Sequence, residues 1–387
     1  MKNISKEALK LHKKVKGKLE IKSKVILKTK KDLSLAYTPG VAIPCLEIKK
    51  NENLVYDYTW KGNVVAIVTD GSAVLGLGNI GAKAALPVME GKAILFKEFG
   101  GVDAIPICLD TQNPDEIIAT VKKISPAFGG INLEDISAPR CFLIERKLNE
   151  DLDIPVFHDD QDGTAIVVLA ALINSLKLSN KNIQNIKIVI NGAGAAGIAI
   201  TKILYKAGAR KILLCDREGI IYKGRKENMN FAKEEILEYL WEESKKGTLK
   251  DAMKESDVFI GVSGPNLVTE EMIKSMNKYP TVFAMSNPIP EIMPDKAKKA
   301  GAYIVGTGRS DFPNQINNLL AFPGIFRGTF DAKSKKITEK MKIAASLAIA
   351  NYIPEKKLSP SYIIPSALDK NVAKVVAYNV KKAALSS

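Results

Sequence analysis

The sequence predicts an α/β protein with two domains. An N-terminal α/β domain is expected in residues 1–157, and a domain built on a doubly wound parallel sheet and ending in helices in residues 158–387. Three observations support this prediction. A chain of 387 residues is long enough for about two domains. Strand patterns alternate with helix patterns along both halves, as in α/β folds. In the second half, the glycine-rich turn Gly192–Gly197 lies between a predicted strand and a predicted helix.

The composition is that of a soluble globular protein, with 46% hydrophobic and 26% charged residues. The longest apolar run, residues 165–173, is too short to span a bilayer, so we expect no membrane partner. The N-terminus lacks the pattern of a signal peptide. The four cysteines form no CxxC pair and are expected to be small core residues, which favours a reducing, cytoplasmic setting.

The net charge of +15 raises the alternative of a basic nucleic-acid-binding protein. Much of the excess is local, because twelve lysines and only two acids occur in the first 31 residues. Aromatic residues are not interleaved with them in a pattern for base stacking. A solvated lysine-rich helix and connection is therefore the preferred interpretation, and no nucleic-acid partner is expected.

In the first domain, a Pro39-Gly40 turn signal places Tyr37 on a loop before a helix. Lys92 lies in a predicted helix that follows a glycine-rich loop. The elements expected in order are a strand at 63–69, a helix at 83–96, a strand at 103–109, a helix at 114–125, a strand ending at Glu134-Asp135, and a helix at 139–150.

Two groups of carboxylates lie in apolar surroundings. Glu134 and Asp135 form one pair, and Asp159, Asp160 and Asp162 form a group between an apolar lead-in and a helix predicted at 165–176. Crowded carboxylates repel one another unless a cation lies between them, and oxygen ligands suit a hard divalent cation. The alternative for the second group is a helix N-terminus, where acids complement the helix dipole.

The second domain contains a dinucleotide fingerprint. A strand at 187–191 leads directly into Gly192, Ala193, Gly194, Ala195, Ala196 and Gly197, and a helix is expected at 198–207. The next strand, 211–216, ends at Asp216, 24 residues after Gly192. This context predicts a Rossmann-type site with the pyrophosphate at the helix N-terminus. An acid at position 216 favours NAD, although Arg217, Lys223 or Arg225 could pair with the 2′-phosphate of NADP.

Three later strands fit the same sheet, and ligands of such sheets bind at the carboxyl ends of the strands. The strands are expected at 258–263, 281–286 and 302–306, with Asn287 just after the second. Asn318 follows in a loop. The last segment, 337–387, is predicted to be helical with polar turns.

Together these motifs resemble those of malic enzymes of the short bacterial and archaeal type. The resemblance covers most of the chain. It is carried by Tyr37–Ala42, Thr69–Gly71 with Leu75–Gly78, Glu134-Asp135, Phe157–Asp160 with Gly163–Ala165, the fingerprint, Ser286–Pro288, and Asn317-Asn318 before Phe322–Gly324.

The resemblance implies a reaction and a set of roles. (S)-malate would be oxidised and decarboxylated to pyruvate and carbon dioxide with NAD or NADP and Mg²⁺ or Mn²⁺, and oxaloacetate would also be decarboxylated. Tyr37 would be the general acid and Lys92 the general base, in a catalytic N-terminal domain. The protein would be a homodimer. The metal ligands would be Glu134, Asp135 and Asp160. Asn287 and Asn318 would contact the substrate or the nicotinamide.

The sequence departs from the family at one position and leaves two alternatives open. Large malic enzymes carry an arginine for a malate carboxylate where Ala73 stands here, so Ser72 or backbone groups would replace it. From the residues alone, Lys97 competes with Lys92 as the base. An amino-acid dehydrogenase of similar architecture is the alternative enzyme, but it needs no metal and leaves the acidic pairs unexplained.

Overall fold

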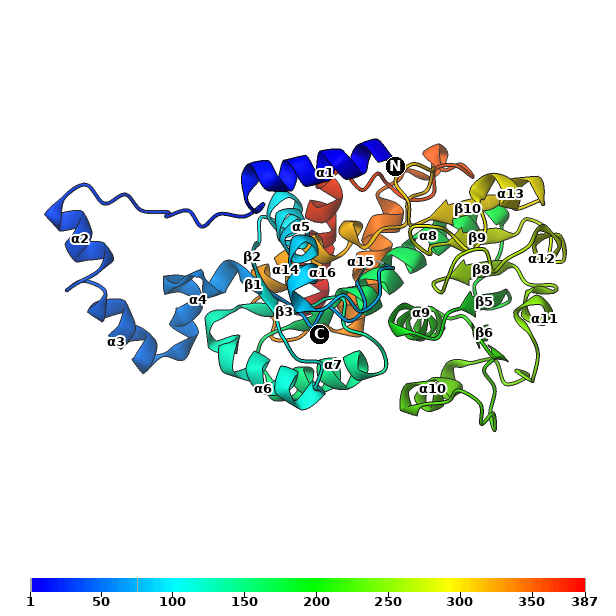
Figure 1. The fold of residues 1–387 in the computed structure, drawn as a ribbon, viewed down its shortest axis with the longest axis horizontal. Coiled ribbons are helices and arrows are strands. Elements are labelled where there is room, and N and C mark those ends of the chain that lie inside the picture. The colour runs from blue at the N-terminus through cyan, green and yellow to red at the C-terminus, as the bar shows by residue number, and fades with distance from the viewer. Residues whose placement is uncertain (1, 75, 387) are drawn as a thin grey trace.

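The computed structural model describes residues 2–74 and 76–386 and contains two sheets (Figure 1). The first sheet has the order β2-β1-β3-β4 and is parallel throughout. Its strands are β1 (Val64–Thr69), β2 (Asp103–Cys108), β3 (Gly130–Leu133) and β4 (Val156–His158). The connecting helices are α5 (Ala82–Gly100), α6 (Pro114–Ile124) and α7 (Arg140–Asp151). Each predicted element of this region is present, so the α/β prediction is confirmed.

The second sheet has the order β10-β9-β8-β5-β6-β7, in which only β7 is antiparallel to its neighbour. Its strands are β5 (Lys187–Asn191), β6 (Lys211–Asp216), β7 (Gly219–Ile220), β8 (Val258–Gly261), β9 (Thr281–Ala284) and β10 (Ile304–Thr307). The helices between them are α9 (Ala195–Lys206), α10 (Phe231–Glu235), α11 (Leu249–Met253), α12 (Glu270–Lys274) and α13 (Pro294–Lys299). The chain reverses direction across the sheet between β5 and β8, which makes the sheet doubly wound.

Strands β8 and β9 end two residues earlier than the sequence predicts, and the reason is a buried acid. The backbone amides of Ser263 and Ser286 donate to the two carboxylate oxygens of Glu291, at 3.0 and 3.1 Å. These amides therefore leave the sheet. Glu291 is fully buried, and no pattern around it in the sequence indicated this role.

The two sheets are joined through a buried helix, α8 (Thr164–Ser179), which follows a π-helical turn at Asp159–Gly163. By length and composition the stretch Asp159–Ser179 could cross a membrane, but 67% of its most apolar window is buried inside the protein, as in the core helix of a soluble protein. The predicted domain boundary at 157/158 falls within β4, just before this turn.

The C-terminal helices are α14 (Phe322–Asp331), α15 (Glu339–Asn351) and α16 (Lys370–Leu385). Helix α15 packs against α8, whereas α14 and α16 pack against the first sheet's helix α5. Phe322 and Phe326 of α14 lie 4.7 and 5.3 Å from the ring centroid of Phe96 on α5. The last part of the chain thus completes the core of the first domain.

The N-terminal arm, residues 19–55, stands apart from the body of the protein (Figure 1). Helix α1 (Lys2–Val15) precedes it, and the arm carries α2 (Lys30–Ala36) and α3 (Ala42–Lys50) before α4 (Val55–Tyr58). Neither α2 nor α3 has a buried residue in the chain as described. Helix α2 was not predicted. Cys45 on α3 is exposed, which corrects the expectation that every cysteine lies in a core.

Candidate active site

Three carboxylates meet where two neighbouring strands end. Glu134 and Asp135 follow β3, and Asp160 lies in the π-helical turn after β4, which pairs with β3. One oxygen of each lies within 4.8 Å of the others. The backbone amide of Asp135 donates to Asp160 Oδ2 at 2.8 Å, which holds the two segments together. An all-oxygen set of this size fits Mg²⁺ or Mn²⁺.

Keeping these buried carboxylates charged costs free energy when no cation lies between them. Burial raises the pKa of Glu134 to about 7; the charge of Asp160 adds to this rise and the charge of Lys92 opposes it. Burial also raises the pKa of Asp160 to about 6, against the attraction of Lys92. A bound divalent cation would compensate the crowded charges. The residues present therefore fit the cation that the sequence predicts.

Lys92 of α5 lies beside the same cluster. Its Nζ is 2.9 Å from Glu134 Oε1 and also pairs with Asp159, and the residue is 8% exposed. Burial lowers the pKa of Lys92, but Asp159 and Glu134 together raise it above the usual range. The described residues thus raise the pKa of Lys92, because two carboxylates surround the amine. Lys97 points elsewhere: it is exposed and pairs with Asp103 at 2.6 Å.

The π-helical turn depends on Gly163. A Cβ at this position would lie 1.8 Å from Asp159 Oδ1, so the turn can close over the Asp159 carboxylate only with glycine. Asp159 is fully buried and holds Lys92. The sequence predicted Asp159 as part of an acidic group but not as the partner of Lys92.

The glycine fingerprint has the expected geometry. Gly192 has φ +121°, and a Cβ on Gly197 would lie 1.7 Å from the carbonyl oxygen of Gly192. Helix α9 can therefore begin directly at the end of β5. It starts at Ala195, three residues before the predicted start, so the turn itself forms the helix N-terminus.

A cavity of about 460 Å³ joins the acidic cluster to this helix N-terminus. Its wall includes Asp135 and Asp160 from the first half and Gly194–Ala196, Asn287 and Asn318 from the second. Residues that the sequence analysis did not select as site residues also line it, namely Ser137, Thr164, Ser286 and Asn317. The positions of these residues near strand ends could have indicated a site. Their residue types could not, since small polar residues are common in any loop.

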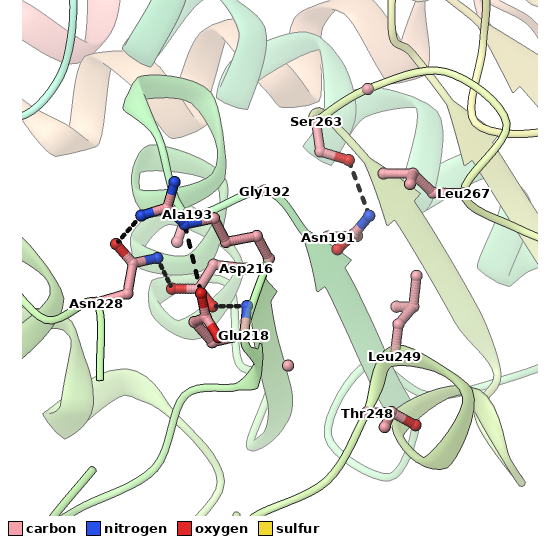
Figure 2. Close-up of a pocket in the computed structure, with 13 residues that line it drawn as sticks. Asn191, Gly192, Ala193, Asp216, Glu218, Asn228, Thr248, Leu249, Ser263 and Leu267 are labelled. Carbon is pink, nitrogen blue, oxygen red and sulfur yellow. Dashed lines mark hydrogen bonds and ion pairs between the residues drawn. The ribbon is translucent and has the colours of Figure 1, made fainter. Parts of the chain in front are cut away.

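A second cavity, of about 880 Å³, lies on the other side of the glycine turn (Figure 2). It is lined by Gly192, Ala193 and Asp216, and Ser263 borders both cavities. Asn191 Nδ2 donates to Ser263 Oγ at 2.8 Å between the two spaces. The paired cavities extend on both sides of the fingerprint, as a dinucleotide requires.

Two predicted residues are placed differently from the expectation. In the described chain Ser72 does not line the cavity. Its hydroxyl donates to Asp70 Oδ1 at 2.5 Å and accepts from the amide of Ser137 at 2.9 Å, so it stabilises the loop. Tyr37 is the C-cap residue of α2 and is 65% exposed. Helix α2 lies apart from α5, the helix that carries Lys92 (Figure 1).

The fold and the site define a class. A doubly wound nucleotide-binding sheet, facing a carboxylate cluster across one cavity, is the arrangement of a dinucleotide-dependent oxidoreductase with a site for a divalent cation.

Comparison with known proteins gives the family. The model of the malic enzyme N-terminal domain matches residues 16–149, and that of the malic enzyme NAD-binding domain matches residues 161–385. The chain belongs to the malic enzyme family. It is 59% identical to the bifunctional malic/malolactic enzyme of Bacillus subtilis, over all of this chain and 94% of that protein.

Other relatives are named for different cofactors, some for NAD and some for NADP. An NAD-dependent malic enzyme of Geobacillus stearothermophilus is 53% identical, over 99% of this chain and 79% of that protein. An NADP-dependent malic enzyme of Salmonella typhimurium is 47% identical, over 96% of this chain and 51% of that protein. The crystal structure of the NAD-dependent malic enzyme of Thermotoga maritima superposes with a TM-score of 0.94 at 49% identity, covering 97% of this chain and 98% of that one.

Proposed function

We propose that this protein oxidises (S)-malate and decarboxylates it to pyruvate and carbon dioxide, with reduction of NAD or NADP and with Mg²⁺ or Mn²⁺, and that it also decarboxylates oxaloacetate. One observation carries the proposal. A single cavity is lined both by two of the three carboxylates suited to a cation, Asp135 and Asp160, and by the helix N-terminus suited to a dinucleotide. A substrate in this cavity lies between the two, as hydride transfer from a cation-bound hydroxy acid requires.

Glu134, Asp135 and Asp160 would hold the cation, which when bound would polarise the substrate oxygens and stabilise the enolate left by decarboxylation. Lys92 is the proposed general base. Its Nζ contacts Glu134, so the amine lies beside the proposed cation site, although neither of these two side chains lines the cavity. His158, the histidine of this region, is fully buried, and burial lowers its pKa to about 4. The support for Lys92 is its contact with a proposed cation ligand, and a bound cation would lower the raised pKa of its amine.

Asn287 and Asn318 are proposed to bind the substrate carboxylates and the nicotinamide end of the cofactor. Both line the cavity, and among the described residues of its wall there is neither an arginine nor a lysine. Amide and backbone N–H donors would therefore replace the missing arginine at Ala73. Ser72 contributes indirectly, through its bond to the amide of Ser137, which does line the cavity.

We further propose that the protein is a homodimer in which Tyr37 of the partner subunit completes each site as general acid. The arm is anchored at both ends: the backbone amide of Lys18 donates to Glu90 at 3.1 Å, and Lys61 Nζ donates to the carbonyl of Ser125 at 3.0 Å. Between the anchors, apolar side chains such as Ile21 and Leu35 are 85% and 67% exposed. Exposed apolar side chains along one segment indicate an interface, and a second copy of the chain is the simplest partner.

The proposed setting is the cytoplasm, with a small-molecule substrate. The support is the set of four free cysteines among the described residues, which suits a reducing compartment.

A spectrophotometric assay tests the function. Malate and Mn²⁺ with NAD or NADP should give reduced cofactor and an equal amount of pyruvate, and EDTA should abolish the reaction. Lactate should be measured as well, because the Bacillus subtilis relative is named as a malic and malolactic enzyme. Absence of turnover together with salt-dependent binding to random DNA would contradict the proposal and favour the nucleic-acid alternative.

A further inference from the structure

Asp216, the acid expected to face the adenosine ribose, is already fully hydrogen-bonded, and Figure 2 shows its bonds with Glu218 and Asn228. Its Oδ1 accepts from the amide of Glu218 at 2.9 Å and from Arg225 Nη2 at 2.7 Å. Its Oδ2 accepts from Lys233 Nζ at 2.6 Å, from Arg225 Nη2 at 2.8 Å and from Asn228 Nδ2 at 3.0 Å. A carboxylate offers about four lone-pair positions. These bonds therefore leave Asp216 without an acceptor for ribose hydroxyls.

The net charge of Asp216 and the residues around it is positive, unlike that of a free carboxylate. Arg225 and Lys233 are 4% and 6% exposed, so two buried cations face one carboxylate and leave one positive charge in excess. The repulsion of a 2′-phosphate that a free acid would exert is thereby removed. The remaining donors of Arg225 bind the carbonyls of Gly219, Ile220 and Glu227. Asp216 thus holds the loop that follows β6 in place.

Two other charged side chains line the same cavity, Arg217 and Glu218. The Arg217 side chain is 79% exposed, and its contacts to Asn228 Oδ1 and Glu218 Oε1 are both as long as 3.5 Å. The Glu218 side chain is 48% exposed. An arginine can bind a 2′-phosphate through two parallel hydrogen bonds, and a glutamate can accept from a free 2′-hydroxyl.

We infer that the Arg217–Glu218 pair decides the choice between NADP and NAD, and that Asp216 is a positioning residue for the loop. The inference rests on the proposed function, since it assumes that this cavity takes the adenosine half of a dinucleotide. It replaces the expectation that Asp216 gives a preference for NAD. The protein then binds NADP at least as tightly as NAD.

The test is fluorescence titration of NADH and NADPH into the protein without malate or metal. The wild type should bind NADPH at least as tightly as NADH. Arg217→Ala should weaken NADPH binding about tenfold, the loss of one charge-assisted contact, and leave NADH within about twofold. Glu218→Gln should shift the ratio toward NADPH. Lys226→Ala, which removes the same charge from an exposed neighbour, is the control and should leave the ratio unchanged.

Asp216→Asn should weaken both cofactors in parallel and lower the melting temperature, because it leaves Arg225 and Lys233 without a full counter-charge. A shift of the ratio by Asp216→Asn at unchanged melting temperature, or no shift by Arg217→Ala, would overturn the inference. Because the variants at positions 217 and 218 are exposed, the outcome does not depend on the folding of Asp216→Asn. If neither NADH nor NADPH binds at all, the proposed function is overturned as well, whereas binding with an unchanged ratio in the variants overturns this inference alone.

Discussion

At the scale of single residues, the site depends on how Lys92 is surrounded. Its amine contacts Glu134 and Asp159, which come from the ends of β3 and β4. Breaking a buried ion pair by removing one partner costs about 3–5 kcal/mol, since the other charge is left buried. The side chain is therefore both a candidate base and a counter-charge, and a test has to separate the two roles.

Lys92→Ala is expected to lower kcat for malate oxidation by about 10²–10⁴-fold, the usual contribution of a general base, and also to lower the melting temperature. Lys92→Arg keeps the positive charge but cannot act as a base near neutral pH, so it should lose turnover with a smaller loss of stability. Lys97→Ala is the matched control and should retain activity within about twofold, because its exposed pair with Asp103 is weak. Turnover by Lys92→Arg near the wild-type rate would exclude Lys92 as the base.

Asp135→Asn should leave the fold intact, lower metal-dependent turnover by about a hundredfold or more, and weaken Mn²⁺ binding, since a neutral amide is a poor ligand for a hard cation. Calorimetric titration with Mn²⁺ measures the affinity, and the rise in melting temperature on adding Mn²⁺ provides a second reading. Asp110→Asn, at an exposed carboxylate, is the control. Equal Mn²⁺ affinity in Asp135→Asn and the wild type would remove Asp135 from the ligand set.

At the scale of elements, the two glycines of the turn before and within α9 have different roles. A Cβ on Gly197 would meet the carbonyl of Gly192 at 1.7 Å, whereas a Cβ on Gly194 has nothing within 4 Å. Gly194 also has φ −93°, which any residue can adopt. Gly197 is thus needed by the fold, and Gly194 leaves room for what binds at the helix N-terminus.

Gly197→Ala should therefore destabilise the protein without cofactor by about 1–3 kcal/mol, because α9 must move away from the turn. Gly194→Ala should keep the wild-type melting temperature but weaken NADH and NADPH binding, because its methyl group would lie where the pyrophosphate approaches. Thermal unfolding and fluorescence titration of both variants give the comparison. A loss of stability in Gly194→Ala equal to that in Gly197→Ala would contradict this division of roles.

At the scale of the whole molecule, the N-terminal arm and the C-terminal helices behave in opposite ways. Helix α14 returns to the first domain and buries Phe322 and Phe326 against Phe96. The arm instead leaves the body and exposes Ile21, Leu35 and Tyr37 (Figure 1). A site that needs Tyr37 is then incomplete in one chain.

Mixing two inactive variants tests this arrangement. Tyr37→Phe and Lys92→Arg, unfolded together and refolded, should form half mixed dimers, each with one intact site made of Lys92 from one subunit and Tyr37 from the other. The expected activity is about a quarter of the wild type. If Tyr37 acts within its own chain, the mixture stays inactive. Wild-type protein taken through the same procedure controls for refolding yield.

The sequence by itself determined the α/β class, the order of strands and helices, the acidic pairs and the dinucleotide turn. These features depend on patterns of a few neighbouring residues. In the run from Lys187 to Gly197, for example, the periodicity of apolar residues and the spacing of glycines dictate the local structure. Such patterns carry over into the fold because the strand ends of one parallel sheet meet at one edge.

Only the tertiary structure decided which groups are free to act. The burial of Lys92 in an ion pair depends on Asp159, 67 residues further along the chain, whereas Lys97 remains exposed. The hydrogen-bonding of Ser72 depends on Ser137, and the neutralisation of Asp216 depends on Arg225 and Lys233 folding back over it. A side chain's type states what bonds it can make, but its partners are fixed by packing between distant segments, and those partners determine its charge, its pKa and its remaining capacity to bind.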